Sequence, residues 1–223
     1  MFVAIKQLKD NDDENLFRAE TDFVTKLTKT PHPNILPLLA TYKLGQKYHL
    51  IFPWAPKNLR EYWTSDKHPT WDKTSCILFL TQVHGLASAL KAIHHYHISG
   101  VARVETDSSD IKLDRLTRTS AFPRAPPTFD ESLKTYGRHG DLKPENVLCL
   151  KDGTLQVADF GLGRFHRLES RSLVDPKSVS CSETYSPPEL VTGERVSRAY
   201  DIWSLGCIFL EFISVSFRSV LLR

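Results

Sequence analysis

The sequence predicts an α+β protein in which a strand-rich N-terminal part is followed by a helical part. Short apolar runs with β-branched residues gather near the N-terminus, at 3–6, 36–42 and 47–52. Long segments with helical spacing or a nearly continuous apolar character follow, at 74–97 and 202–222. A chain of 223 residues is long enough to bury one core or to form two lobes that share a cleft.

Composition and charge exclude several classes of protein. Hydrophobic residues make up 41% of the chain and charged residues 25%, as in an ordinary soluble globular protein. The net charge of +3 is small, and lysine and arginine are interleaved with aspartate and glutamate, which argues against nucleic-acid binding. Glu211 and Arg218 interrupt the apolar segment 202–222, so we expect a helix buried on all sides and no membrane span.

The N-terminus and the cysteines indicate the cellular compartment. The N-terminus lacks the basic start and the long apolar stretch of a signal peptide. The four cysteines are scattered singly, without the spacing of metal ligands. We therefore expect reduced thiols in a cytoplasmic protein, with the nucleus as the alternative compartment.

The first strand ends in a lysine, Lys6, and a helix is predicted after it. Asn11 to Glu14 offer helix caps and first-turn acids, and apolar residues then recur at helical spacing. Glu20 lies beside this apolar stripe, fourteen residues after Lys6. Prolines at 30–35 end the helix, because each proline disfavours helical backbone at the residue before it. Taken alone, the lysine would be a solvated strand end and the glutamate an ordinary surface carboxylate.

A proline-rich connection at 53–56 leads from the strands into the helices, and alone it is compatible with a simple linker. A short helix is predicted at 59–63 and a long one at 74–97. The predicted apolar face of the long helix consists of Ile77, Leu80, Val83, Leu86, Ala87, Leu90 and Ile93.

The end of the long helix and the segment after it carry no readable function. His94, His95 and His97 lie there, but no carboxylate or cysteine joins them at ligand spacing, so we do not expect a metal site. From 99 to about 138 periodicity disappears, and serine, threonine, proline and charged residues are mixed. We predict a long loop or a partly disordered insertion over this segment.

Chemically useful side chains are concentrated in the sequence His-Gly-Asp-Leu-Lys-Pro-Glu-Asn, at 139–146. It offers a carboxylate at Asp141, a cation at Lys143 and a carboxamide at Asn146. Two strand-like runs joined by Asp152-Gly153 follow, and a tight hairpin there would bring Asp141 and Asn146 close to Asp159. Asparagine and aspartate oxygens suit a divalent cation, and a second carboxylate could accept a proton.

Six short motifs stand out along the chain. In chain order they are Val-Ala-Ile-Lys at 3–6, His-Pro-Asn-Ile at 32–35, the loop at 139–146, Asp-Phe-Gly at 159–161, Pro-Pro-Glu at 187–189 and Asp-Ile-Trp-Ser-Leu-Gly at 201–206. Together they resemble the eukaryotic protein kinase family, and the resemblance covers roughly 2–212. The His-Gly-Asp loop is also similar to small-molecule phosphotransferases of the aminoglycoside and choline kinase type, but those lack the Pro-Pro-Glu and Asp-Ile-Trp-Ser-Leu-Gly motifs at these distances.

The resemblance implies a bilobal kinase-like fold with a truncated β-rich N-lobe and an incomplete helical C-lobe. Residues 1–55 would form a partial N-lobe and the hinge, without the family's Gly-rich strands. Residues 56–212 would form the C-lobe through the buried helix that begins at Asp201, with the insertion at about 99–138. Residues 213–223 would be a divergent tail. We expect the missing Gly-rich strands to weaken nucleotide binding.

The resemblance also implies ATP- and Mg²⁺-dependent phosphoryl transfer. Asp141 would orient the attacking hydroxyl and accept its proton, and Lys143 would neutralise charge on the γ-phosphate. Asn146 and Asp159 would hold Mg²⁺. Lys6, held in place by an ion pair with Glu20, would position the α- and β-phosphates. Adenine would be bound by Ala4, Leu148, the carbonyl of Pro53 and the amide of Ala55, with Phe52 as gatekeeper. Asp201 would hold the backbone of the catalytic loop.

Two further positions indicate specificity and regulation. Lys143 resembles the Ser/Thr-directed kinases, and Ser182 occupies the place of the hydroxyl that bonds the catalytic aspartate in them. Gly140 stands where most members have arginine, which normally receives an activation-loop phosphate. We therefore expect that phosphorylation of Ser178 is not the principal on-switch.

A protein substrate with a Ser/Thr acceptor is implied. A non-catalytic pseudokinase that binds proteins is the alternative, and a small-molecule phosphotransferase is a distant third. Nothing in the sequence indicates the oligomeric state.

Overall fold

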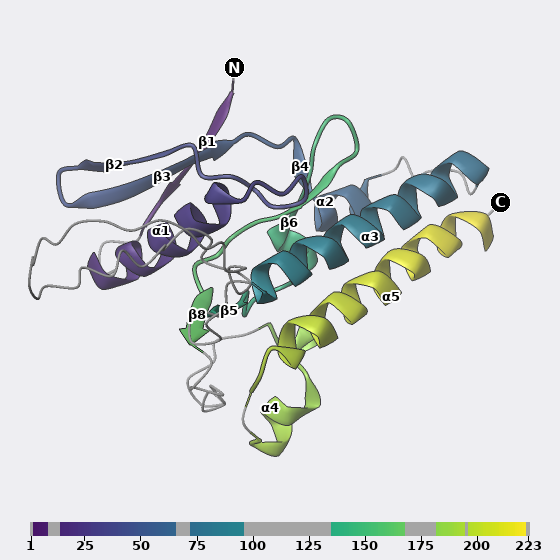
Figure 1. Cartoon of the computed structure of the whole chain (residues 1–223). Coiled ribbons are helices and arrows are strands. Elements are labelled where there is room, and N and C mark those ends of the chain that lie inside the picture. Colours follow the sequence, from purple (N-terminus) through teal and green to yellow (C-terminus); the bar gives the residue numbers. More distant parts are fainter. Residues whose placement is uncertain are drawn as a thin grey trace, which may run out of the picture.

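The computed structural model of the chain describes residues 2–8, 14–65, 72–95, 135–167, 182–194 and 196–221. It confirms the α+β class, because a sheet-rich N-terminal region is followed by a helical region (Figure 1). The elements are β1 (Val3–Gln7), α1 (Glu14–Lys29), β2 (Ala40–Leu44), β3 (Lys47–Pro53), β4 (Lys57–Asn58), α2 (Leu59–Thr64), α3 (Lys73–His94), β5 (Thr135–Arg138), β6 (Val147–Cys149), β7 (Leu155–Val157), β8 (Arg164–Arg167), α4 (Pro188–Thr192) and α5 (Ala199–Leu221), with short 3-10 helices at Pro144–Asn146 and Glu183–Tyr185.

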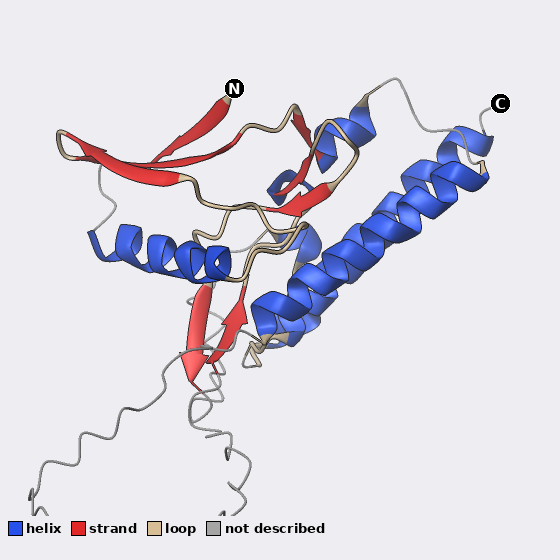
Figure 2. Cartoon of the chain, turned by 45° about the horizontal axis from the view of Figure 1, so that its top comes forward, coloured by secondary structure: helices blue, strands red, loops and turns tan. Residues whose placement is uncertain are grey.

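The N-terminal sheet has the strand order β1-β3-β2, and both pairs are antiparallel. Helix α1 lies along one face of this sheet (Figures 1 and 2). The ring of Phe17 on α1 stacks on Tyr48 of β3, with 4.2 Å between centroids. Phe23 and Leu27 follow on the same helical stripe and are buried. The predicted amphipathic helix therefore has its apolar side on the core; its predicted cap at 11–13 lies outside the described residues.

Residues 34–36, in the loop between α1 and β2, are attached to the second sheet, whereas the Leu39 N–H of the same loop donates to the Ile51 carbonyl of β3 at 2.8 Å. The strand predicted at 36–42 begins only at Ala40. Ile35 forms a parallel bridge with Val157, and the Leu36 N–H donates to the Val157 carbonyl at 2.9 Å. The Asn34 side chain donates to the Leu155 carbonyl at 2.8 Å. Residues 34–36 therefore cannot pair with β3, because their hydrogen bonds are made to β7.

The second sheet contains the predicted hairpin and has the strand order β4-β6-β7. Val147 pairs with Val157, and both are buried. The turn at Asp152-Gly153 forms as predicted, with Gly153 at φ +87°, a conformation that glycine adopts at little cost. Helix α2 begins at the edge of this sheet with a capping box, in which Asn58 and Glu61 each accept a backbone N–H of the other.

Helices α3 and α5 run antiparallel and side by side (Figures 1 and 2). They contribute to one core cluster, to which Leu86, Leu90 and Ile93 of α3 and Leu205, Ile208 and Phe212 of α5 belong. The predicted face of α3 is wrong in its first half, where Ile77 and Leu80 are 55% and 62% exposed, and at Ala87, which is also exposed. The expectation that the C-terminal helix is buried on all sides is also wrong, because Ile202 and Leu210 are 61% and 67% exposed. Within the described residues, the neighbouring elements cover only one side of α5.

Two helices of the described part, Lys73–His94 and Ala199–Ser216, are long and apolar enough to cross a membrane by length and composition alone. Both contribute buried side chains to the core cluster, as a core helix of a globular protein does.

The prediction that 99–138 lacks regular structure is wrong for its last four residues. They form β5, which pairs antiparallel with β8 in a two-stranded sheet. A four-residue strand that contains two non-apolar ends and a glycine gives no periodic signal, so only its partner strand reveals it. The rest of the predicted insertion, 99–134, lies outside the described residues, as do Ser178 and Cys181.

Candidate active site

Lys6 lies on the inner side of β1 and contacts two carboxylates. Its Nζ is 2.7 Å from Glu20 Oε1 on α1 and 2.8 Å from Asp159 Oδ1 after β7. The ion pair between Lys6 and Glu20 that the sequence predicts is therefore present. Burial by itself would lower the pKa of Lys6, but the charges of Glu20 and Asp159 raise it above its ordinary value of 10.5. The lysine is a fixed cation in this site.

Asp159 directly follows the second sheet and has a strained backbone. Its φ is +60°, which a non-glycine residue adopts at a cost. The Gly161 N–H donates to its Oδ1 at 3.4 Å, and 47% of its side chain is exposed. Burial by itself would raise the pKa of Asp159, but Lys6 and these hydrogen bonds lower it below the ordinary value of 3.8. The side chain is thus an ionised carboxylate that reaches solvent.

The loop 139–146 brings Asp141, Lys143 and Asn146 together. Lys143 Nζ lies 2.7 Å from Asp141 Oδ2 and donates to Ser182 Oγ at 3.2 Å. Asn146 Nδ2 donates to the Asp141 carbonyl at 2.8 Å and to its Oδ2 at 3.0 Å. Ser182 therefore reaches the aspartate through Lys143. Asp141 has a cation and an amide donor at one carboxylate oxygen, an arrangement that holds its orientation.

Asp201, at the start of α5, holds the backbone of this loop. It is completely buried. Its Oδ2 accepts the His139 N–H at 2.8 Å and the His94 Nε2–H at 2.8 Å, and its Oδ1 accepts the Gly140 N–H at 2.9 Å. Burial would raise the pKa of Asp201, but these hydrogen bonds keep it below its ordinary value. The predicted role of Asp201 is confirmed, and His94 has a structural partner.

His139 joins the loop to Asp159 and its neighbours. The ring is fully buried, donates from Nε2 to the Ala158 carbonyl at 3.0 Å and accepts the Asp141 N–H at Nδ1, at 3.2 Å. One tautomer, protonated at Nε2, makes both bonds. The ring also contacts Phe160, which in turn packs on Phe23 of α1. The hairpin completes the link, because the Ala158 N–H donates to the Asn146 carbonyl at 2.9 Å.

The predicted adenine-binding residues are divided between the two sheets. Ala4 lies on β1 opposite Phe52, and Val3 lies opposite Pro53, the first residue of the connection 53–56. Phe52 is buried and Ala55 is partly buried. Leu148 lies in the middle of β6, opposite Gln156. The structure thus groups Lys6 with Glu20 and Asp159, groups Asp141 with Lys143 and Asn146, and joins the two groups through the hairpin.

Known proteins share these motifs. The family model for the protein kinase domain matches residues 137–218, which include the loop, Asp159 and Asp201. This segment of the chain therefore resembles the protein kinase domain. A probable cell division protein kinase of Encephalitozoon cuniculi is 27% identical over 215 residues, which are 96% of this chain and 62% of that protein.

Shorter similarities point to the same group of kinases. Cyclin-dependent kinase 2 of Caenorhabditis elegans is 43% identical over 77 residues, or 34% of this chain and 20% of that protein. Serine/threonine-protein kinase SSN3 of Yarrowia lipolytica is 40% identical over 78 residues, or 34% of this chain and 19% of that protein. The chain thus spans less than two thirds of the length of each of these relatives.

The kinase metal site that the sequence predicts has a suitable donor set. Among the described residues no three His, Cys, Asp or Glu side chains gather as a self-sufficient metal cluster. Asn146 and Asp159 instead offer one amide and one carboxylate oxygen group at adjacent ends of the hairpin. This set fits Mg²⁺, which commonly takes one or two protein ligands and completes its shell with water and phosphate oxygens.

Sequence reasoning missed a cation beside the kinase loop. Gly140 has φ +84°, and a Cβ placed on it would lie 3.2 Å from the Leu162 carbonyl oxygen and 3.7 Å from Arg138 Nε. Arg138 is buried, with only 8% of its surface exposed. A buried guanidinium therefore lies beside the position where most kinases have an arginine side chain. Its proximity in sequence, two residues before Gly140, was the available signal.

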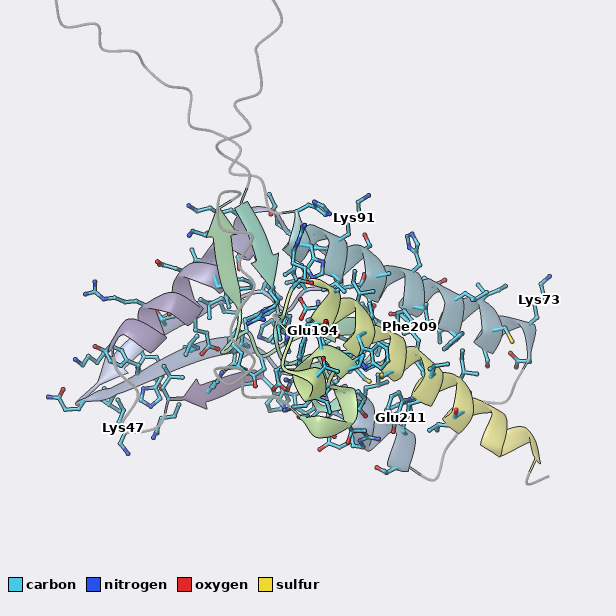
Figure 3. All side chains as sticks on the ribbon, turned by 90° about the horizontal axis from the view of Figure 1, so that it is seen from below. Lys47, Lys73, Lys91, Glu194, Phe209 and Glu211 are labelled. Carbon is cyan, nitrogen blue, oxygen red and sulfur yellow. The ribbon has the colours of Figure 1, made fainter. Side chains whose placement is uncertain are left out.

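A second group of residues, which the sequence analysis did not predict, surrounds Arg60 on α2. Its guanidinium donates to Glu211 of α5, to Glu145 of the loop at 3.0 Å and to the Tyr185 hydroxyl. The hydrogen bond to Glu211 outweighs burial and raises the pKa of Arg60 further. Figure 3 shows Glu211 on α5 where this helix passes α2. The group connects the kinase loop to two helices that are distant in sequence.

Proposed function

We propose that this chain carries the catalytic residues of an ATP-dependent serine/threonine protein kinase. The observation that carries the proposal is the joint placement of Lys6 on Glu20 and Asp159, while Asp141 is oriented by Lys143 and Asn146 and the loop is anchored on Asp201. Phosphoryl transfer depends on positioning and charge neutralisation more than on covalent chemistry. These contacts supply both.

The roles divide between the two groups of side chains. Asp141 orients the hydroxyl of the acceptor and takes its proton at the carboxylate, while Lys143 neutralises charge on the transferred group. Lys6 binds the α- and β-phosphates, and Glu20 keeps it aimed at them. ATP with Mg²⁺ supplies the phosphoryl group and the divalent charge when bound. Asn146 and Asp159 would hold the ion, and Ala4, Leu148, Pro53 and Ala55 would hold the adenine.

Three observations support serine or threonine as the acceptor. Lys143 is the residue of Ser/Thr-directed kinases at this position, and its Nζ contacts the Ser182 hydroxyl at 3.2 Å. The names of the relatives include a serine/threonine-protein kinase and a cyclin-dependent kinase. The substrate would therefore be a protein that presents a serine or threonine hydroxyl to Asp141.

We also propose an intracellular setting for this kinase, in the cytoplasm or the nucleus. The scattered cysteines and the weak net charge of +3 support a protein with reduced thiols and without nucleic-acid or membrane partners. Cys76, Cys149 and Cys207 are free thiols in the described residues.

The proposal is tested by measuring phosphate transfer from Mg-ATP to a generic Ser/Thr substrate, such as myelin basic protein. We expect the Asp141→Asn variant to transfer phosphate at least about 100-fold more slowly, because the amide cannot accept the proton. The substitution leaves the shape of the side chain unchanged, so the melting temperature and the Kd for Mg-ATP serve as controls for folding. Equal transfer by both proteins would contradict the kinase proposal.

The same assay separates the alternatives. The second candidate is a pseudokinase, which would bind partner proteins without transferring phosphate. A small-molecule phosphotransferase would instead consume ATP with an aminoglycoside or choline as acceptor and without any protein substrate. Transfer only to the small molecule would replace the proposal, and no transfer to either acceptor would favour the pseudokinase.

A further inference from the structure

We propose that a cavity between α2, α3 and the β6–β7 hairpin binds a small amphipathic anion, that is, an apolar ring or chain that carries a carboxylate, sulfonate or phosphate group. The cavity has a volume of about 330 Å³. This lies at the lower end of the range for small-molecule sites. The site is separate from the proposed kinase site, because Cys149 of β6 lines the cavity and the preceding residue, Leu148, does not.

The wall of the cavity is apolar. Its hydrophobic side chains include Leu78 and Phe79 of α3, Leu155 of β7 and Phe212 of α5. Burial raises the pKa of Cys149 to about 12; nearby Lys57 opposes part of this rise, and the Glu61 carboxylate adds to it. The thiol is therefore protonated at neutral pH and behaves as a small apolar group.

One of the polar side chains in the wall is already hydrogen-bonded to the backbone. Gln82 of α3 lines the cavity, and its Oε1 accepts the Leu155 N–H at 2.8 Å. This bond ties α3 to the first residue of β7 and fixes the orientation of the amide. A ligand that enters the cavity thus meets mainly hydrocarbon, and it gains free energy from burying its own apolar part.

Two lysines line the same cavity and give it a positive charge. Lys57 Nζ lies 5.9 Å from the ring centroid of Tyr62, and Lys151 Nζ lies 5.8 Å from that of Trp54. Neither lysine has a carboxylate within 4.0 Å among the residues that the structure describes, and no aspartate or glutamate lines the cavity. Glu61 of α2 does not line the cavity, and its carboxylate accepts the Asn58 N–H at the start of that helix.

The charge of these lysines determines the kind of ligand. An uncharged apolar molecule would gain only from burial, and a cation would be repelled by both lysines. An anionic head group at the rim would pair with them, while the long lysine side chains stay against the aromatic rings. The cavity is therefore complementary to a molecule that is apolar at one end and negatively charged at the other.

The experiment compares two fluorescent probes of similar shape, anilinonaphthalenesulfonate, which is anionic, and N-phenylnaphthylamine, which is uncharged. Both are titrated into the full chain carrying Asp141→Asn and without nucleotide, so that the result does not depend on kinase activity. We expect saturable binding of the anionic probe at one site per chain. Binding that is absent, or that does not saturate, would overturn the proposal.

Two sets of variants locate the site and its charge. Replacing both Lys57 and Lys151 with alanine should weaken binding of the anionic probe about fivefold and binding of the uncharged probe less than about twofold. This is the effect expected for two partly exposed charge pairs. The control removes Lys73 and Lys91, which lie at the two ends of α3 and do not line the cavity (Figure 3). An equal effect of both double variants on the anionic probe would refute the role of the rim lysines.

A filled cavity gives the second test. Leu78→Trp should reduce binding of both probes at least about tenfold, because the indole would occupy the space that the probes need. Ile77→Trp is the matched control, since Ile77 is 55% exposed on the same helix and does not line the cavity. Circular dichroism and melting temperatures verify that each variant is folded. Undiminished binding to a folded Leu78→Trp protein would place the probes elsewhere and refute the proposal.

Discussion

Asp201 and Asp159 both organise the candidate active site, but they do so in opposite surroundings. Asp201 is 0% exposed, and its two oxygens accept three hydrogen bonds from the His139 and Gly140 backbone and from His94. Asp159 leaves 47% of its side chain exposed and pairs with Lys6. Burial would raise the pKa of both groups, and specific partners lower it in both. A lowered pKa therefore accompanies a buried hydrogen-bond network at Asp201 and a solvent-screened ion pair at Asp159.

The largest effect on stability is expected when the hydrogen-bond network of Asp201 is broken. Asp201→Asn keeps the shape of the side chain but replaces one acceptor oxygen with an NH₂ group, which must face at least one of the three N–H donors. We expect a decrease in the free energy of unfolding of about 3–5 kcal/mol, the usual result of breaking a buried charged network. Urea denaturation at neutral pH measures it.

Asp152→Asn provides the matched control. Asp152 is exposed in the β6–β7 turn, and its Oδ1 accepts the Thr154 backbone N–H at 2.9 Å. The remaining oxygen of an asparagine can accept that bond, so the urea midpoint should change little. A similar loss of stability in both variants would mean that burial does not distinguish the two kinds of aspartate.

An intermediate effect is expected at Gly140, whose N–H is bound by Asp201. Its φ of +84° strains any other residue, and an added Cβ would lie 3.2 Å from the Leu162 carbonyl oxygen and 3.7 Å from Arg138 Nε. We expect Gly140→Ala to lower the free energy of unfolding by about 1–3 kcal/mol. Gly140→Arg, which introduces the common family residue, should be worse because it adds a second cation beside a buried one.

Gly45→Ala separates the two causes of that loss. Gly45 has a similar φ of +61° but nothing within 4 Å of an added Cβ. It therefore reports the backbone cost alone, again by urea denaturation. If Gly45→Ala and Gly140→Ala were equally destabilising, close packing against Leu162 and Arg138 would play no part.

The smallest effect is expected at Lys6, on the exposed side of the comparison. Lys6→Met should cost about 1 kcal/mol or less, because 35% of the lysine side chain is exposed and its ion pairs are screened. The raised pKa of Lys6 makes its contribution complete below 10.5 and lost as the pH rises through the folded-state pKa. The lowered pKa of Asp159 makes its contribution complete above 3.8 and lost as the pH falls through the folded-state pKa.

Thermal unfolding of both proteins across this pH range measures the prediction. The difference in stability between wild type and Lys6→Met should be greatest near neutral pH and should shrink at both extremes. A difference that stays constant from acid to alkaline pH would show that Lys6 stabilises the fold by packing and not by charge.

Local patterns in the sequence predicted the parts of the site that depend on local structure. The strand ending in Lys6, the helix carrying Glu20 and the turn at Asp152-Gly153 each have a short signal in a single segment. Their contacts followed once the segments were placed in one fold. The α+β class was predictable for the same reason, since strand-like and helix-like runs are separated along the chain.

The remaining features depend on partners distant in the sequence. Whether Leu210 is exposed on α5 depends on which elements pack there, and periodicity cannot reveal this in a helix that is apolar all round. The bond between His94 and Asp201 joins residues 107 positions apart. β5 exists only through its pairing with β8. Tertiary packing therefore decided the features that the sequence left open.

The attachment of 34–36 to β7 has a mechanical consequence. These residues follow α1 directly, yet the Asn34 side chain and the Leu36 N–H are bonded to the second sheet. If the N-terminal sheet rotates relative to α3 and α5, these residues must stay with the second sheet. We expect the chain to bend at 37–38, before the Leu39 N–H bonds to the Ile51 carbonyl of β3, and at the connection 53–56. The C-terminal end of α1 would then stay in place, while Glu20, nearer the start of this helix, would move toward or away from Lys6.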